Sequence, residues 1–411
     1  MPLNMLKIKS RIKRAHLESK KIGNSKISSF FFSYVLSTLI KRGYSKEIAR
    51  NFKFLVKFKN PVIHFYLAKS LHLNGIYDKA IEVIKINLVK NFSFLDSHYI
   101  LSDCYYRINN SEESWEVLEG VLTHSNRLKT WLLLANQVNT KDDFAKLHEL
   151  WQLHVNKQTI PSYHFELNGY IATGALRAKE YAFAESIWRD VIQSIIDKRC
   201  VYSSPKNKKL NINDASEALL DLKRVLQTHH IEFFLVSGTL LGCIRENTLL
   251  GHDKDIDIGI WRETPPKEVE KIITNSGLFE MQAIRSEHVL RIKHVNQVAI
   301  DIFYHYKEES NYWHGGVKLK WNNTPFRLID HGFLGDIFKI PEDHNLYLTE
   351  NYGDWKTPKK DFDSAFDTPN AIIMNQDEMN IHAYKQLAMA YLEGNQINIK
   401  KFSNYLKTNL V

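Results

Sequence analysis

Apolar residues in the first half of this 411-residue chain recur every three or four positions. From about residue 28 to residue 195 this spacing continues with few glycines and prolines and almost no strand-like alternation. Apolar side chains at that period cover one face of an α-helix. The pattern therefore predicts a domain of stacked helices over residues 28–198.

A repeat of about 34 residues runs through this helical half. The segment 67–84 has the spacing of a helix-turn-helix unit, with Ala68, Gly75, Tyr77 and Ala80 at its marker positions. Related positions follow in three further copies: Leu101, Ser102, Tyr105 and Ser114; Leu134, Ala135 and Phe144; Ile171, Ala172, Tyr181 and Ala184. These units resemble degenerate tetratricopeptide repeats, in which small residues let paired helices approach closely. Such a stack either presents a concave face to an acceptor, a protein partner or a second copy, or is only structural support.

The pattern changes after residues 199–212, which hold a proline, serines and lysines but little apolar content, and which we interpret as a linker. A helix is predicted from 214 to 229, then strands at 231–236, 254–261, 289–295 and 298–306, with closing helices beyond residue 375. We therefore expect an α+β protein of two domains. An all-α solenoid is followed by an α/β domain with a mixed sheet over residues 213–411.

Composition narrows the choice of partners and compartment. The formal net charge of +9 favours anionic partners, but no motif with interleaved aromatics accompanies it, so nucleic acid is not expected. Three cysteines without disulfide or metal spacing favour a reducing compartment, and no apolar stretch reaches the roughly 20 residues of a membrane span. Residues 1–27 are predicted to form a basic N-terminal tail, either solvated or lying on an anionic membrane surface.

The first element with clear chemistry is a turn. An apolar strand is expected to end at Ser237 and Gly238, and a short helix to begin at about Thr239. Glycine permits close approach of the backbone to a ligand, and a helix N-terminus attracts phosphate. The turn is therefore a candidate phosphate cradle.

Four aspartates follow on two predicted strands. Asp253, Asp255 and Asp257 alternate, which places three carboxylates on one strand face, and Asp301 stands within a later apolar strand. Carboxylates this close repel one another unless a cation neutralises them, and hard oxygen ligands suit Mg²⁺ or Mn²⁺. We expect the four to meet in a metal site that performs phosphoryl-type transfer.

Four motifs in this order resemble the LicD/fukutin family of phosphotransferases. They are GTLLGCIR at 238–245, DKDID at 253–257, DIF at 301–303, and PEDHNLYLTENYGDWKTP at 341–358. The resemblance covers about residues 215–366 and implies a nucleotidyltransferase-like fold. It also implies metal-dependent transfer of a phospho-alcohol, such as phosphocholine, ribitol phosphate or glycerol phosphate. The implied donor is a CDP-alcohol, and the implied acceptor is a hydroxyl of a cell-surface glycan.

Roles follow from the resemblance and from charge. Asp253, Asp255, Asp257 and Asp301 are the expected catalytic residues and metal ligands, with Asp253 alternatively the general base. Substrate contacts are expected at Ser237, Gly238, Thr239, Arg245, Arg291, Lys293, Lys318, Lys320 and Tyr352. A solvated strand face is the alternative for Arg291 and the three lysines.

Two other functions use the same residues differently. A nucleotidyltransferase would transfer a nucleotide monophosphate and release pyrophosphate, whereas a non-enzymatic scaffold would use the repeats and keep a vestigial transferase domain. The expected enzyme is cytoplasmic, at the inner face of the membrane when it associates with one. The alcohol, the acceptor and the identity of the base stay open.

Overall fold

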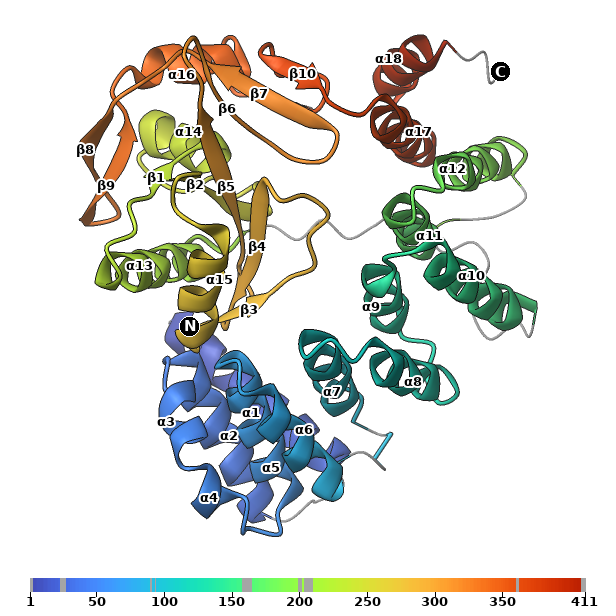
Figure 1. Cartoon of the computed structure of the whole chain (residues 1–411), viewed down its shortest axis with the longest axis vertical. Coiled ribbons are helices and arrows are strands. Elements are labelled where there is room, and N and C mark those ends of the chain that lie inside the picture. The colour runs from blue at the N-terminus through green and yellow to red at the C-terminus, as the bar shows by residue number, and fades with distance from the viewer. Residues whose placement is uncertain are drawn as a thin grey trace.

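The structure, a computed structural model, describes residues 3–22, 27–88, 91–92, 94–156, 165–198, 202, 210–359 and 362–407 (Figure 1). The helices before the sheet are α1 (Leu3–Lys21), α2 (Ile27–Lys41), α3 (Ser45–Arg50), α4 (Phe52–Leu55), α5 (Pro61–Leu73), α6 (Tyr77–Asn87), α7 (Asp96–Arg107), α8 (Ser111–Leu122), α9 (Leu128–Gln137), α10 (Lys141–Asn156), α11 (Phe165–Arg177), α12 (Tyr181–Ile196) and α13 (Ile212–Thr228). The strands are β1 (Phe234–Leu235), β2 (Asp255–Trp261), β3 (Phe279–Met281), β4 (Val289–His294), β5 (Ala299–Lys307), β6 (Tyr312–Gly315), β7 (Leu319–Asn323), β8 (Leu328–Phe333), β9 (Asp336–Pro341) and β10 (Ala371–Ile373). Among and after them lie α14 (Ser237–Glu246), α15 (Pro266–Asn275), α16 (His344–Tyr352), α17 (Gln376–Glu393) and α18 (Gln396–Leu406).

Helices α5 to α12 form four consecutive pairs that match the four predicted repeats. The turns within the pairs are residues 74–76, 108–110, 138–140 and 178–180. In the first pair Ala68 and Ala80 are fully buried. In the second, the hydroxyls of Ser102 and Ser114 lie 2.9 Å apart and form a hydrogen bond. Small residues therefore stand where the paired helices are in contact, and the prediction of a stacked-helix region is confirmed.

The N-terminal segment differs from the predicted tail because residues 3–21 form helix α1, which packs along α2. Ala15 and Ser19 are buried on its inner side. The Glu18 carboxylate accepts hydrogen bonds from Ser33 Oγ, at 3.1 Å, and from the Tyr66 hydroxyl. These polar contacts fix the second half of α1 to the helices behind it.

The strands form one mixed sheet with the order β10-β7-β6-β5-β2-β1-β9-β8, from which β4 and β3 branch at β5. β2 is parallel to β5 and β1 is parallel to β9, while the other pairs are antiparallel. The predicted α+β fold with an all-helical part and a mixed sheet is confirmed. The predicted strand at 231–236 is reduced to two residues, and β3, β6 and β8 to β10 lie in segments for which the pattern predicted no strand.

The core of the sheet domain lies under α13, α14 and α15. Apolar side chains of α13, such as Leu219 and Leu222, belong to the same buried cluster as Ile256 and Ile258 of β2. One face of β2 is thus buried, and the residues that alternate with these isoleucines lie on the opposite face. This alternation positions the aspartates described below.

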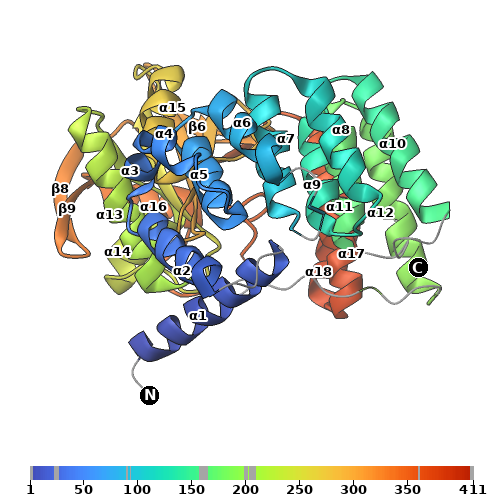
Figure 2. The ribbon, with the colours of Figure 1, turned by 90° about the horizontal axis from the view of Figure 1, so that it is seen from below.

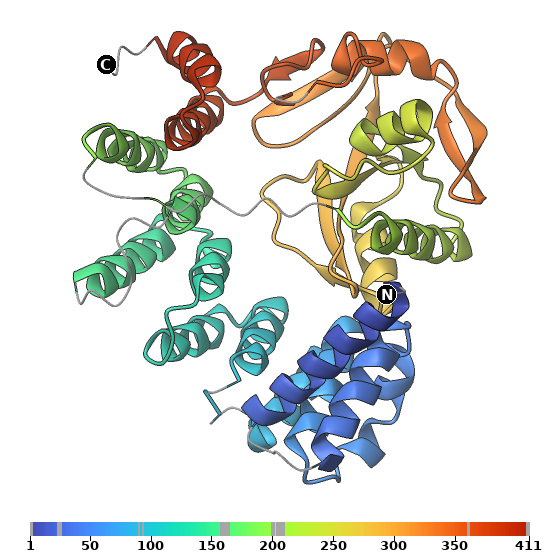
Figure 3. The ribbon, with the colours of Figure 1, turned by 180° about the vertical axis from the view of Figure 1, so that it is seen from behind.

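The predicted second domain, residues 213–411, extends too far, because the C-terminal helices belong to the helical stack. Helix α17 packs along α12, and α18 packs on α17, at the end of the helical stack (Figures 1 and 3). Ile381, Leu387 and Ala388 belong to the same buried cluster as Trp188 of α12. The sheet domain is therefore flanked in sequence by helices of one stack, and the chain returns to that stack after residue 375.

The helical part contacts the sheet domain near strands β3 and β4. Ser45 Oγ donates to the Gly277 carbonyl at 2.5 Å. Further along the stack, Arg107 donates to the Met281 carbonyl and Arg177 to the Ile284 carbonyl, both at 2.9 Å. Figure 1 shows the stack as an arc that runs from this side of the sheet round to β10. None of the described helices is both long enough and apolar enough to cross a bilayer.

Candidate functional site

The site begins at the junction between β1 and α14. The backbone of Val236 is extended, and Ser237 then has a φ of +48°, a backbone conformation that residues other than glycine seldom adopt. A Cβ atom on Gly238 would lie 2.4 Å from Asp253 Oδ2. The absence of a side chain at Gly238 therefore lets the Asp253 carboxylate pack against the first turn of α14.

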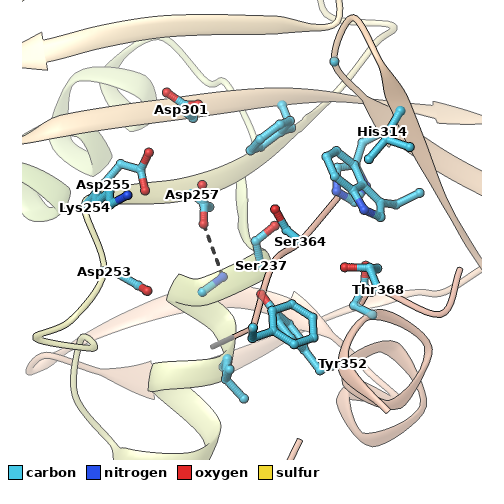
Figure 4. Close-up of a pocket in the computed structure, with 18 of the residues that line it drawn as sticks. Ser237, Asp253, Lys254, Asp255, Asp257, Asp301, His314, Tyr352, Ser364 and Thr368 are labelled. Atoms are coloured by element: carbon cyan, nitrogen blue, oxygen red, sulfur yellow. Dashed lines mark hydrogen bonds between the residues drawn. The ribbon is translucent and has the colours of Figure 1, made fainter. Parts of the chain in front are cut away.

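The aspartates of β2 and β5 come together through the register of the two parallel strands. Asp257 lies directly opposite Asp301, and Asp255 precedes Asp257 by two residues on the same strand face. Figure 4 shows these carboxylates and that of Asp253 along one side of a pocket, close to Ser237. The structure thus brings together all four aspartates that the sequence analysis selected.

Hydrogen bonds fix two of these carboxylates. Asp257 Oδ2 accepts from the backbone N–H of Gly238 at 3.2 Å. The backbone N–H of Asp257 in turn donates to Thr239 Oγ1 at 2.8 Å, so the α14 turn and β2 are joined twice. On β5, Asp301 Oδ2 accepts from Arg291 Nε at 3.0 Å.

Burial and mutual repulsion make these carboxyl groups unusually weak acids. Burial is the largest cause of the raised pKa of Asp257, and the charges of Asp255, Asp301 and Asp253 raise it further. Burial also raises the pKa of Asp253 to about 6 and that of Asp301 to about 6, although Arg291 opposes the shift at Asp301. The pKa of Asp255 is raised as well, chiefly by burial. A cation bound among them would favour the ionised forms.

The donor set suits a magnesium or manganese ion better than a closed structural metal. Among the residues that the structure describes, no three His, Cys, Asp or Glu side chains converge tightly enough to hold an ion by themselves. Mg²⁺ commonly takes one or two carboxylates and completes its shell with water and substrate phosphates. The all-oxygen set of Asp255, Asp257 and Asp301, open on one side to a cavity, fits that mode of binding.

The aspartates form one wall of a cavity of about 780 Å³, large enough for a nucleotide-sized ligand. Other parts of the wall come from Phe303, two residues after Asp301 on β5, from His314 and Trp321 of the β6–β7 hairpin, and from Tyr352 at the end of α16 with Trp355 beyond it. The cavity therefore has an acidic wall and an aromatic wall.

Six of the nine predicted substrate contacts line this cavity: Ser237, Gly238, Arg245, Arg291, Lys318 and Tyr352. The other three require correction. Thr239 is buried and its hydroxyl binds the Asp257 backbone, so it supports the site from behind. Lys293 lies beyond the cavity and interacts electrostatically with Lys129 of α9, whereas the Lys320 ammonium lies 5.1 Å from the centre of the Trp313 ring.

Arg245 lines the cavity but is held by protein groups. Its Nη1 donates to the Trp355 carbonyl at 3.1 Å, and its Nη2 contacts Glu246 Oε1 at 3.0 Å. The guanidinium therefore fixes the segment that carries Trp355, which is itself buried. In this arrangement Arg245 shapes the cavity wall, and its predicted contact with a diphosphate stays a prediction.

Sequence reasoning missed two charged residues in the cavity wall. Arg285, from the loop before β4, and Glu378, from α17, form an ion pair there. Glu378 is buried in the first turn of α17, where its backbone N–H donates to Oδ1 of the N-cap residue Asn375 at 3.0 Å. No local motif marks either residue, because they meet only when the C-terminal helix returns to the sheet domain.

The close contact at Gly238 leads to a first prediction. We expect Gly238→Ala to lower the phosphotransfer activity that the sequence predicts by about 100-fold, since the added methyl group must displace Asp253 or the start of α14. The matched control is Gly332→Ala, where an added Cβ meets no atom within 4 Å. Activity assays should show the difference, and circular dichroism should show that both variants fold. Equal activity of the two variants would contradict the close packing of Asp253 on α14.

Comparisons with known proteins match the region that contains this site. Residues 230–330 match the family described as LicD/FKTN/FKRP, nucleotidyltransferase domain. The mouse protein named ribitol-5-phosphate transferase FKTN is 28% identical over 192 residues, which are 44% of this chain and 41% of that protein. Its human counterpart is 27% identical over 166 residues, 38% of this chain and 36% of that protein. An uncharacterized protein of Rickettsia prowazekii (strain Madrid E) is 25% identical over 136 residues, 33% of this chain and 45% of that protein.

The region shared with these proteins covers less than half of this chain, but it includes the candidate site. The chain spans about two fifths of the length of the FKTN proteins that it matches. The family match includes β1, α14, the loop from α14 to β2, β2 and β5, and the last three of these carry all four aspartates. It includes none of the helices α1 to α12, nor α17 and α18. Residues 230–330 therefore match a nucleotidyltransferase domain of the LicD/FKTN/FKRP family, and in this chain they are joined to a stack of helices.

Proposed function

We propose that this chain transfers a phospho-alcohol, such as ribitol phosphate, from a CDP-activated donor to a hydroxyl group of a glycan. The observation that carries the proposal is the alignment of Asp257 with Asp301 across β2 and β5, beside the Gly238 turn and within a cavity of nucleotide size. The likeness to proteins named ribitol-5-phosphate transferase supports this type of reaction. Support for the CDP donor comes from the motifs that resemble the LicD/fukutin family.

The proposed reaction is a displacement at phosphorus. The acceptor oxygen forms a bond to the phosphorus that bears the alcohol, the bond from that phosphorus to CMP breaks, and the acceptor hydroxyl gives up its proton. Asp253, with a pKa of about 6, is a base of suitable strength for that proton, and its carboxylate packs against the first turn of α14. Proton transfer to Asp253 is the role that we assign to it.

The remaining aspartates are assigned to Mg²⁺ or Mn²⁺. Asp255, Asp257 and Asp301 would hold the ion, which when bound would neutralise charge on the donor diphosphate. The hydrogen bond from Gly238 N–H keeps Asp257 pointing into the cavity, and Arg291 keeps Asp301 in place. The aromatic wall at Trp321, His314 and Tyr352 offers flat surfaces for the base or the acceptor sugar.

Product analysis by mass spectrometry tests the proposal. The purified full chain is incubated with Mg²⁺, a panel of CDP-alcohols and candidate glycans, in parallel with the Asp255→Asn variant. We expect CMP release together with a phospho-alcohol mass on one acceptor, and loss of both in the variant. The matched control is Asp330→Asn, an exposed aspartate with an ordinary surface ion pair, which should retain activity.

Other outcomes would change the assignment. Release of pyrophosphate from a nucleoside triphosphate would identify nucleotidyl transfer. Binding of Mn²⁺ provides a readout that does not depend on finding the correct acceptor. If the chain neither turns over any donor nor binds Mn²⁺ in an Asp255-dependent manner, the scaffold interpretation replaces the enzymatic one.

A further inference from the structure

A second surface with unusual chemistry lies far along the chain from the catalytic residues, at α4 and the turn that joins it to α5. Phe54 is 61% exposed and Phe58 is 39% exposed. Their rings pack edge to face with centroids 5.1 Å apart. Lys53, Lys57 and Lys59 are exposed between and beside them. Two partly exposed phenylalanines thus lie next to three exposed lysines in the chain.

The start of α2 extends this apolar surface. Ile27 is 87% exposed, and Phe31, one helical turn further on, is 59% exposed. The Asn60 amide donates to Ser29 Oγ at 3.3 Å, which holds the beginning of α2 against the beginning of α5. Ile27 is two residues from Ser29, and Phe58 is two residues from Asn60. We call the surface formed by Ile27, Phe31, Phe54 and Phe58 with the three lysines the aromatic-basic face; Figure 2 views the end of the molecule that carries α2, α4 and α5.

The segment of the chain that carries this face is strongly basic. Between Glu18 and Asp78 the chain contains eleven lysines and arginines but a single acidic residue, Glu47. Protein–protein interfaces are poor in lysine, whereas surfaces that bind anionic bilayers combine lysines with aromatic and aliphatic side chains. Exposed phenylalanines insert at the headgroup boundary, and lysines pair with lipid phosphates. The combination fits a bilayer better than a protein partner.

We propose that the aromatic-basic face docks the protein on an anionic phospholipid bilayer. Phe54 and Phe58 enter the boundary between headgroups and acyl chains, and Lys53, Lys57 and Lys59 contact the lipid phosphates. Ile27 and Phe31 add apolar area at the same end of the helical stack. This docking does not depend on the proposed transferase reaction, because none of these residues belongs to the cavity.

Vesicle flotation with the full chain tests the docking. One set of vesicles is pure phosphatidylcholine, and the other is an equimolar mixture of phosphatidylcholine and phosphatidylglycerol. We expect binding to the mixed vesicles that weakens as salt is raised. Phe54→Ser/Phe58→Ser should lower the partition coefficient by about tenfold or more, and Lys57→Glu/Lys59→Glu by a similar factor.

Matched controls separate the face from general effects of polarity and charge. Ile337→Ser/Ile397→Ser removes two apolar side chains that are 58% and 81% exposed on β9 and α18. Lys267→Glu/Lys271→Glu makes the same change in net charge at exposed positions of α15. Both control pairs should bind vesicles as the unaltered protein does, and thermal melts should show that all four variants fold.

Three results would overturn the proposal. The first is absence of binding to the mixed vesicles, and the second is equal loss of binding in the test and control variants. The third is a concentration-dependent dimer, seen by light scattering, that Phe54→Ser/Phe58→Ser abolishes without any effect on vesicle binding. That third result would identify the aromatic-basic face as a contact between copies of this chain.

Discussion

Asp257→Asn is expected to lose transferase activity by about 100-fold or more and, at neutral pH, to be more stable than the unaltered protein. The side chain is half-buried and lies among three other carboxylates, so its negative charge opposes folding when no cation is bound. Asparagine keeps an oxygen that can accept from Gly238 N–H but carries no charge. Activity and stability should therefore change in opposite directions.

The sign of the pH dependence follows from the raised pKa of Asp257. The folded protein binds this proton more tightly than the unfolded chain does, so the carboxyl group opposes folding least at acidic pH. Its unfavourable contribution grows as the pH rises above about 4, the ordinary range of an aspartate. The gain in stability of Asp257→Asn should accordingly be small at pH 4 and larger at pH 7.5.

Thermal melts in EDTA at these two pH values measure the effect without a bound metal. A rise in Tm of a few degrees at pH 7.5 is expected. Asp330→Asn is the control, because the Asp330 side chain is 64% exposed and its removal should change stability little. A lower Tm for Asp257→Asn at neutral pH, or the same gain at both pH values, would show that the carboxylate is not held in a repulsive cluster.

Leu387→Ala is expected to destabilise the protein by about 2–5 kcal/mol, although residue 387 lies outside the region that matches the family. Leu387 is fully buried in the cluster that joins α17 to α12, where it belongs with Trp188 and Ala388. Removal of three carbon atoms from a packed site leaves a cavity that the two helices cannot easily fill. The cooperative unfolding transition should move to lower denaturant concentration.

Urea titrations followed by circular dichroism give the measurement. Ile397→Ala on α18 is the control, since Ile397 is 81% exposed and its truncation should change stability by less than about 0.5 kcal/mol. If Leu387→Ala unfolds like the control, α17 does not pack on the helical stack in solution. The cavity wall formed by Glu378 would then be absent as well.

The helical half was predictable because its signals are local. A small residue such as Ala68 or Ser102 recurs with the repeat, and each one marks a contact between two helices that are adjacent in sequence. The place of α17 was not predictable in this way. Its apolar residues indicated a buried helix, but no local pattern says whether the partner is the nearby sheet or α12, almost 200 residues earlier.

The acidic wall of the site was predictable for a related reason. Alternation along one strand places Asp255 and Asp257 on one face, and only the pairing with Asp301 required a long-range assumption. The positions of the basic residues were harder to predict. Alternation along a strand shows on which face a side chain lies, but it does not show how far a cavity extends along that face. Lys293 shares the alternation of Arg291, yet it lies beyond the cavity and near α9.

The return of the chain to its own helical stack has a consequence for synthesis. Arg189 of α12 and Tyr384 of α17, which form a hydrogen bond, are 195 residues apart in sequence. At the usual rates of translation, α12 emerges roughly 10 to 40 seconds before the helix that covers it. During that time the side of α12 that α17 covers in the folded protein is uncovered, although Trp188 already packs against Phe165 of α11, and the part of the cavity wall formed by Glu378 does not yet exist. A nascent chain of this protein therefore exposes the side of α12 that α17 covers until α17 is made, and the part of the candidate site formed by Glu378 appears only then.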